Sequence, residues 1–438
     1  MGSIGWSWEQ HRFLMYQCLS LPFAFLFYFL AKRGHLSLTY RYLFVSAGGS
    51  VLAVFTMGIY STLLFTSTLA FVLLVCCVDH SCIHTWAFVM QMLWQTFWHL
   101  LIQYREYYLH ERVSIRLFLA VSTLMLLTQR ITSVSLDLQE KQVVLTPSKR
   151  QTCVTLLPLI SYILNFTTLL GGPLGSYGQF ITLMEGINLT SPPSPPGVVF
   201  LKLMQVLMLE WVRFYLVFFL KHLIHDFNPG ILYGILSTWC LGLVLRIQYY
   251  SHWKISECLN NAAGFGFWED SSGDYFSKWS GLSDGDFWTT EASICMSQFA
   301  RRWNATTASW LRRLVYARHK HFPLLMCFGF SLWWHGLHLG HFVGFFTWAA
   351  TVKADHHIHR NLLPNITPTQ RKIYTFVNWI NTQMIVTCIV IAVEFRNSSG
   401  LRLLSKTYIG LFPLVNIILV LLIKNKTHKC NKTSSLII

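Results

Sequence analysis

Apolar residues in this 438-residue chain fall into long continuous blocks, with neither strand-like alternation nor a helical stripe opposite a polar face. Each block is close to the roughly 20 residues that a helix needs to cross a bilayer. Backbone groups in lipid must be hydrogen-bonded within the structure, so spanning segments are helices or closed barrels, and blocks this long favour helices. We predict an all-α, polytopic transmembrane bundle with about eleven membrane segments, some of them re-entrant. The clearest blocks are Phe13–Leu30, Tyr42–Ile59, Leu63–Val78, Trp86–Leu101, Leu117–Leu127, Leu156–Leu170, Val198–Leu220, Ile231–Leu245, Phe322–Val352, Val377–Val393 and Ile409–Ile423.

The composition supports a membrane protein. Hydrophobic residues make up 53% of the chain and charged residues only 12%, whereas a soluble domain carries roughly 25% charged residues. Polar loops separate the blocks at Asp137–Thr152, Ser191–Pro196 and Phe267–Ser297, and the last of these is the most acidic stretch. No internal repeat or appended soluble domain is evident, so we treat residues 1–438 as a single domain.

The net charge of +16 does not indicate nucleic-acid binding, because much of it lies in short loops and at the C-terminus. Lys32, Arg33 and Arg41 follow the first block, and Lys424, Lys426, Lys429 and Lys432 lie in the tail. The positive-inside rule places both regions in the cytosol and the N-terminus in the lumen. The first block is long and lacks a clear small-residue cleavage site, so we interpret it as a signal anchor rather than a cleaved signal. The basic charge could also attract an anionic, phosphate-bearing cosubstrate.

The eleven cysteines do not show the sequence spacing of metal ligands, and we interpret them mainly as small core residues. His356, His357 and His359 follow Asp355, but a solvated loop is the better interpretation, so we expect no metal site. Asn188, Asn365 and Asn397 begin N-glycosylation sequons, and whether these are glycosylated depends on which side of the membrane they face.

His335 is the strongest candidate for chemistry. It lies in Phe322–Val352, which contains no Asp, Glu, Lys or Arg, and His338 and His341 follow it. A histidine at membrane depth needs a cavity or a partner. Low dielectric keeps the imidazole neutral, as a general base requires. The nearby glycines would allow close helix approach or a local break, although a hydrogen bond between helices would also explain each histidine.

The segment from Arg301 to Arg318 is predicted to be an amphipathic helix at the membrane face. Asn304 would lie on its apolar side, in a stripe with Ala308, Leu311 and Val315. The opposite side would present Arg301, Arg302, Arg312 and Arg313.

Other polar residues have simpler interpretations. Glu210 and Arg213 have the spacing of an ion pair on one helix face. Glu394 and Arg396 mark a helix end. His252, which we also place at a helix end, is a rival catalytic candidate, although an aromatic belt at the membrane interface explains its cluster without chemistry. On composition and spacing alone, a transporter would be a reasonable hypothesis.

The sequence resembles the membrane-bound O-acyltransferase family in three motifs: Arg302-Trp303-Asn304, Trp310-Leu311-Arg312-Arg313 and Trp333-Trp334-His335-Gly336. Members of that family carry an Asn or Asp about thirty residues before an embedded histidine, as Asn304 and His335 do here. The resemblance extends to the members that acylate the ghrelin peptide. It includes Glu106–Glu111, Leu126–Arg130, Tyr249–Trp253, Ala262–Gly266 and Lys426–Asn431, and departs from the pattern at Leu339, where proline is expected.

The resemblance implies an enzyme of the endoplasmic reticulum membrane with an internal reaction chamber. It would transfer a medium-chain acyl group, typically octanoyl, from acyl-CoA to a serine hydroxyl near the N-terminus of the ghrelin peptide precursor, with no bound cofactor. His335 and Asn304 carry over as the catalytic pair. The four arginines would bind CoA phosphates or, equally well, lipid headgroups. Phe328 and Trp348 would form the acyl pocket floor or serve as ordinary core aromatics. A lipid, or another secreted protein, is the alternative acceptor.

Overall fold

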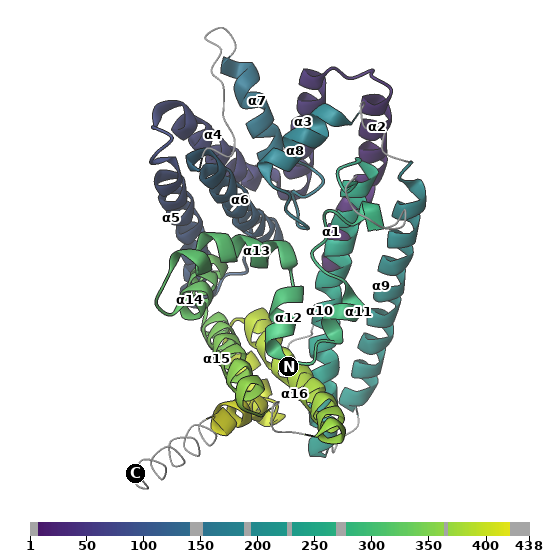
Figure 1. Cartoon of the computed structure of the whole chain (residues 1–438), viewed down its shortest axis with the longest axis vertical. Coiled ribbons are helices and arrows are strands. Elements are labelled where there is room, and N and C mark those ends of the chain that lie inside the picture. The colour runs from purple at the N-terminus through teal and green to yellow at the C-terminus, as the bar shows by residue number, and fades with distance from the viewer. Residues whose placement is uncertain are drawn as a thin grey trace. The chain divides into compact units, whose positions relative to one another are not determined.

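The computed structural model describes residues 8–140, 152–187, 194–225, 230–268, 277–362 and 367–420, and every regular element in these ranges is a helix (Figure 1). The all-α prediction is confirmed. The α-helices are α1 (Trp8–Leu19), α2 (Leu21–Lys32), α3 (Leu38–Met57), α4 (Thr62–Cys77), α5 (Ile83–Gln103), α6 (Ile115–Gln139), α7 (Thr152–Ile163), α8 (Tyr177–Gly186), α9 (Pro196–His225), α10 (Ile231–Ala262), α11 (Phe287–Glu291), α12 (Met296–Arg302), α13 (Ala305–Leu314), α14 (Pro323–His335), α15 (Leu339–Leu362), α16 (Pro368–Phe395) and α17 (Ser398–Lys406).

Within these ranges, six helical segments are long and apolar enough to cross a membrane. A seventh is added if the helices Ser398–Lys406 and Leu411–Val420, which are bent by 76° relative to each other, count as a single span. The chain is therefore a multi-pass membrane protein, but eleven crossings are not confirmed. Two physical reasons account for part of the difference. Helix α5 carries buried Gln91, Gln95 and His99, which lower its hydropathy, and α14 has only 13 residues. The internal chamber stays a prediction.

Two predicted boundaries are wrong. Helix α7 ends at Ile163, so the second half of the block Leu156–Leu170 is not helical. The side chain of Asn165 accepts the backbone N–H of Thr167 at 3.1 Å and stabilises a turn just beyond that end. Helix α10 continues to Ala262, which places His252 inside a helix rather than at its end.

The chain divides into two compact units. The first contains residues 1–208 and 251–284, and the second contains residues 209–250 and 285–438, so α9 and α10 each contribute to both. A buried polar ladder joins helices within the first unit. Gln91 accepts the hydroxyl hydrogen of Ser67 from α4 and donates to Thr128 of α6. Such bonds hold helices together where the surrounding lipid is as apolar as the side chains.

In the first unit, buried arginines donate hydrogen bonds to the last backbone carbonyls of two helices. Arg41, which the charge pattern placed in a cytosolic loop, is 4% exposed and donates to the carbonyls of Met184 and Glu185 at the end of α8. Arg130 likewise donates to Ile163 O at the end of α7. A guanidinium suits these sites because the last carbonyls of a helix have no partner within the helix and carry the negative end of its dipole.

In the second unit, the apolar segment around His335 is broken in two, which is one of the two arrangements that the glycines allow. Helix α14 ends at His335, and Gly336 and Leu337 adopt left-handed backbone conformations, with φ of 102° and 48°. Helix α15 then begins against the end of α16, where the N–H of Gly340 donates to Arg396 O at 2.9 Å.

Histidines 356, 357 and 359 lie in the last turns of α15, not in a solvated loop. His359 is half-buried and His356 is exposed. The basic tail and the sequons at Asn188 and Asn365 lie outside the described residues.

The glycine contact between α15 and α16 is testable by Gly340→Ala. A Cβ at this position would lie 2.0 Å from Ala392 O, a backbone atom that cannot rotate away. We expect about 1–3 kcal/mol of destabilisation, the usual cost of overpacking, read as a lower melting temperature of the purified protein in detergent. Gly329→Ala is the control, because a Cβ there meets no atom within 4 Å. Equal melting temperatures for the two variants would contradict the proposed role of Gly340.

Candidate active site

His335 occupies the last position of α14, directly before the break. The N–H groups of Gly336 and Leu337 both bond back to Leu332 O, which satisfies the backbone freed by the break. The His335 side chain is half-buried rather than fully enclosed. A helix end therefore presents the imidazole without leaving unpaired N–H groups at these two positions.

Aromatic rings surround the imidazole of His335. Its ring centre lies 4.9 Å from that of Trp334, 5.0 Å from Phe345 and 6.0 Å from His341. His338 and His341 are each 4% exposed, with ring centres 5.0 Å apart. All three histidines singled out by the sequence thus gather at the break, and His335 is the most accessible of them.

The predicted continuous helix through Asn304 is wrong. Helix α12 ends at Arg302, and Asn304 is the N-cap of α13, with a left-handed backbone (φ 48°, ψ 62°). Its Oδ1 accepts the N–H of Thr307 at 3.3 Å. Because the cap uses only the oxygen, it leaves the amide Nδ2–H groups able to act as donors.

Helix α13 connects Asn304 with the surroundings of His335. Trp310 and Leu314 lie on a buried face of this helix, and both are 6% exposed. The ring of Trp310 packs 5.0 Å from Trp334 and 5.8 Å from Phe330 on α14. The helix that begins at Asn304 therefore packs against the one that ends at His335.

The two proposed acyl-pocket residues come together. The ring centres of Phe328 on α14 and Trp348 on α15 are 5.7 Å apart. Phe299 of α12 lies 6.2 Å from Trp348 and stacks on Trp303 at 5.4 Å. A continuous aromatic wall therefore runs from Phe328 to Trp303, the residue before Asn304.

The four arginines do not form one cluster of equivalent cations. Arg301 and Arg312 are exposed. Arg302 is also exposed, but its Nη1 donates to Thr289 O at 2.6 Å and to Ser293 Oγ at 3.3 Å, which braces α11. Arg313 is half-buried. Arg301 and Arg312 are thus the better placed to meet an anionic ligand.

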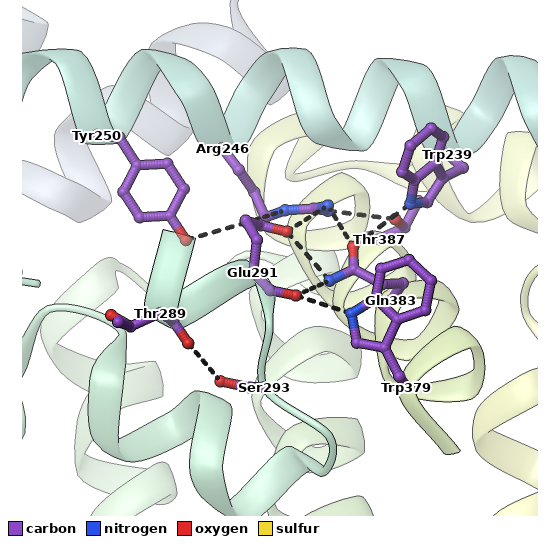
Figure 2. A network of polar contacts seen from close by, with 9 residues as sticks. All are labelled: Trp239, Arg246, Tyr250, Thr289, Glu291, Ser293, Trp379, Gln383 and Thr387. Carbon is purple, nitrogen blue, oxygen red and sulfur yellow. Dashed lines mark hydrogen bonds and ion pairs between the residues drawn. The ribbon is translucent and has the colours of Figure 1, made fainter. Parts of the chain in front are cut away.

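A buried ion pair anchors the segment that leads to Asn304 (Figure 2). Arg246 of α10 is 0% exposed and donates to the carboxylate of Glu291 on α11, through Nε at 2.9 Å and Nη2 at 3.2 Å. The same carboxylate accepts from Tyr250 Oη at 3.0 Å and Gln383 Nε2 at 3.1 Å. A buried ion pair is tolerable when its remaining polar atoms are hydrogen-bonded, as they are here.

Helix α16 holds the backbone of the same segment. Trp379 Nε1 and Gln383 Nε2 each donate to Glu291 O at 2.9 Å, and Asn378 and Thr382 donate to Ile294 O. Sequence reasoning missed this network. Its signals were Arg246, a charge just past an apolar block, and Gln383, an amide inside one.

The remaining polar residues have structural roles. Glu210 and Arg213 form the expected ion pair on α9, with Nε 2.9 Å from Oε2. α16 ends at Phe395, between Glu394 and Arg396, as predicted. His252 Nδ1 lies 3.2 Å from Gln17 Oε1. Burial raises the pKa of the Cys295 thiol, so this cysteine is a poor nucleophile.

Arg246→Met tests the anchoring network. The substitution leaves the Glu291 carboxylate without its cation and should cost about 3–5 kcal/mol, as breaking buried pairs generally does. The double variant Arg246→Met with Glu291→Gln should recover part of that loss, because it removes the unpaired charge. Thermal unfolding of the purified variants provides the measurement. Arg105→Met is the control, since the exposed Arg105–Glu111 pair is worth at most about 1 kcal/mol. A double variant no more stable than Arg246→Met would contradict the charge argument.

Comparison with known proteins agrees with these features. Residues 59–394 match the model of MBOAT, the membrane-bound O-acyltransferase family. The chain is 37% identical to the membrane-bound ghrelin O-acyltransferase of Rattus norvegicus, over 97% of this chain and 100% of the relative. It is 37% identical to the Mus musculus counterpart, over 96% and 98%. The Mus musculus membrane-bound glycerophospholipid O-acyltransferase 1 is 26% identical, over 97% and 92%. The chain belongs to the membrane-bound O-acyltransferase family.

Proposed function

We propose that this acyltransferase moves an octanoyl group from acyl-CoA to a serine hydroxyl near the N-terminus of the ghrelin peptide. The observation that carries the proposal is the identity of 37% to the rat ghrelin acyltransferase across its full length. The break at Gly336 adds physical support, because it presents the imidazole of His335 from a helix end. The enzyme would reside in the endoplasmic reticulum membrane, with its C-terminus in the cytosol.

In the proposed reaction, His335 acts as a general base. It takes the proton of the serine hydroxyl while the oxygen attacks the thioester carbonyl carbon. The carbon–sulfur bond breaks, and the proton passes from His335 to the departing CoA sulfur. The products are a serine ester and free CoA thiol. The rings of Trp334 and Phe345 pack against the imidazole of His335.

Asn304 would stabilise the negative charge that develops on the thioester oxygen. Its Oδ1 is held by the cap of α13, and so its Nδ2 can donate to the substrate without rearrangement. Arg301 and Arg312, both exposed, would bind the phosphates of CoA. The aromatic wall of Phe328 and Trp348 would receive the acyl chain.

A lipid acceptor is the second candidate function. It is favoured by the identity of 26% to a mouse glycerophospholipid acyltransferase over 97% of this chain. Membranes that contain the protein, supplied with labelled octanoyl-CoA and either a ghrelin-like peptide or a lysophospholipid, would separate the two acceptors. Label in the lipid alone would exclude the peptide function, and label in free fatty acid alone would indicate hydrolysis.

The catalytic pair is tested with His335→Ala and Asn304→Asp. Aspartate keeps the oxygen that caps α13 but removes the N–H donor, so it separates charge stabilisation from folding. We expect peptide octanoylation to fall about 10²–10⁴-fold without the base and about 10²–10³-fold without the donor. His80→Ala, at an exposed position in another loop, is the control. Octanoylation by His335→Ala at the wild-type rate would exclude this mechanism.

Phe328→Ala tests the acyl pocket. Removing this ring enlarges the space beside Trp348, so the preference should shift from octanoyl toward longer acyl chains. The ratio of kcat/KM for dodecanoyl-CoA to that for octanoyl-CoA measures the shift, and we expect an increase of about 10-fold or more, given roughly 0.8 kcal/mol per buried methylene. Phe342→Ala, at a site 52% exposed, is the control. An unchanged ratio would remove Phe328 from the pocket.

A further inference from the structure

Three potential metal ligands converge where α12 begins and α15 ends. Cys295 is the N-cap of α12, and Asp355 and His359 lie one turn apart on α15. One ligand atom from each lies within 4.8 Å of the others. Cys295 is 3% exposed and Asp355 7%, while the side chain of His359 is 35% exposed. Residues sixty positions apart in the sequence thus come together around a point that solvent can reach past the imidazole.

The chemistry of these donors fits zinc. Thiolate, imidazole and carboxylate are the ligands that Zn²⁺ takes in proteins, at bond lengths of about 2.0–2.3 Å. Those lengths place the ligand atoms of a tetrahedral site roughly 3.3–3.8 Å apart, so the three would close by about 1 Å. Rotation of the half-exposed His359 side chain can supply most of this movement. Magnesium and calcium prefer all-oxygen sites, and the thiol disfavours them.

Neighbouring groups orient the three ligands. Asp355 Oδ2 accepts the N–H of Ser297 at 3.1 Å, which fixes the carboxylate against α12. His359 Nδ1 lies 3.2 Å from Asp355 O and 3.5 Å from Oδ1. Nearby, the buried hydroxyl of Tyr374 has no hydrogen-bond partner in the described structure, and its ring lies 6.1 Å from that of His359. Such contacts outside the ligand set are typical of metal sites.

We propose that Cys295, Asp355 and His359 bind one Zn²⁺ ion, with water as the fourth ligand. A zinc–sulfur bond replaces the S–H bond of Cys295, and the proton passes to solvent. The ion would tie the start of α12 to the end of α15. Helix α12 leads through Trp303 to Asn304, and α15 follows the break at His335, so the ion would brace both elements of the candidate active site. This role is structural and does not rest on the identity of the acyl acceptor.

The proposal is tested on full-length protein purified without a histidine tag. Elemental analysis should find about one zinc per chain in wild type and in His356→Ala, the control on the exposed side of α15. Cys295→Ser and His359→Ala should contain none. A zinc chelator should lower the melting temperature of wild type but not that of Cys295→Ser, because bound metal stabilises only the folded state that binds it.

Replacement of zinc by Co²⁺ keeps the proposal testable if either variant fails to fold. Wild type loaded with cobalt should show thiolate-to-cobalt charge-transfer absorption, which only a cysteine ligand produces. No zinc in wild type after incubation with excess metal, or equal zinc in all variants, would overturn the proposal. The cluster would then be a carboxylate that contacts a thiol, an imidazole and the backbone N–H of Ser297 at the start of α12. Peptide octanoylation can succeed or fail independently of this outcome.

Discussion

A helix that stops within an uncharged, apolar segment must have its exposed backbone groups satisfied by the protein, and the candidate active site depends on this constraint. At the end of α14, Gly336 and Leu337 adopt left-handed conformations that return their N–H groups to Leu332 O. At the start of α15, the N–H of Gly340 bonds to the end of α16. Without both arrangements, α14 and α15 would continue as one helix, and His335 would lie in its middle rather than at an end.

The need to satisfy backbone groups at a helix terminus also determines the conformation of Asn304, which lies at the start of a helix rather than at its end. The first N–H groups of a helix need acceptors, and the Asn304 side chain supplies one for Thr307. An isolated α13 of 10 residues would be marginal. It is stabilised by the packing of Trp310 on α14 and by the polar contacts that fix the preceding segment to α10 and α16. The position of Asn304 is therefore a property of contacts well outside the site.

The sequence was most informative where the signal is local. Continuous apolar blocks predicted the helices, and the glycines after His335 indicated either close helix approach or a break. Helical periodicity failed at Asn304 because a pattern of apolar spacing does not register a single left-handed residue, although asparagine is a common N-cap. It also missed Arg246 and Glu291, which pair across 45 positions of the sequence. The partners of a buried charge follow from tertiary packing, which spacing within one helix does not contain.

Peptide and lipid acceptors place different demands on a site of this kind. A peptide brings a serine flanked by polar backbone groups, which require hydrogen-bond partners as they leave water. A lysophospholipid brings its hydroxyl on an apolar chain that the membrane already solvates. Half-buried His335 at a helix terminus, with backbone and imidazole groups nearby, can meet the needs of a peptide. In the proposed mechanism, the aromatic wall from Phe328 to Trp303 would receive the acyl chain with either acceptor. Acceptor choice is therefore expected to depend on polar groups beside His335 rather than on the acyl pocket.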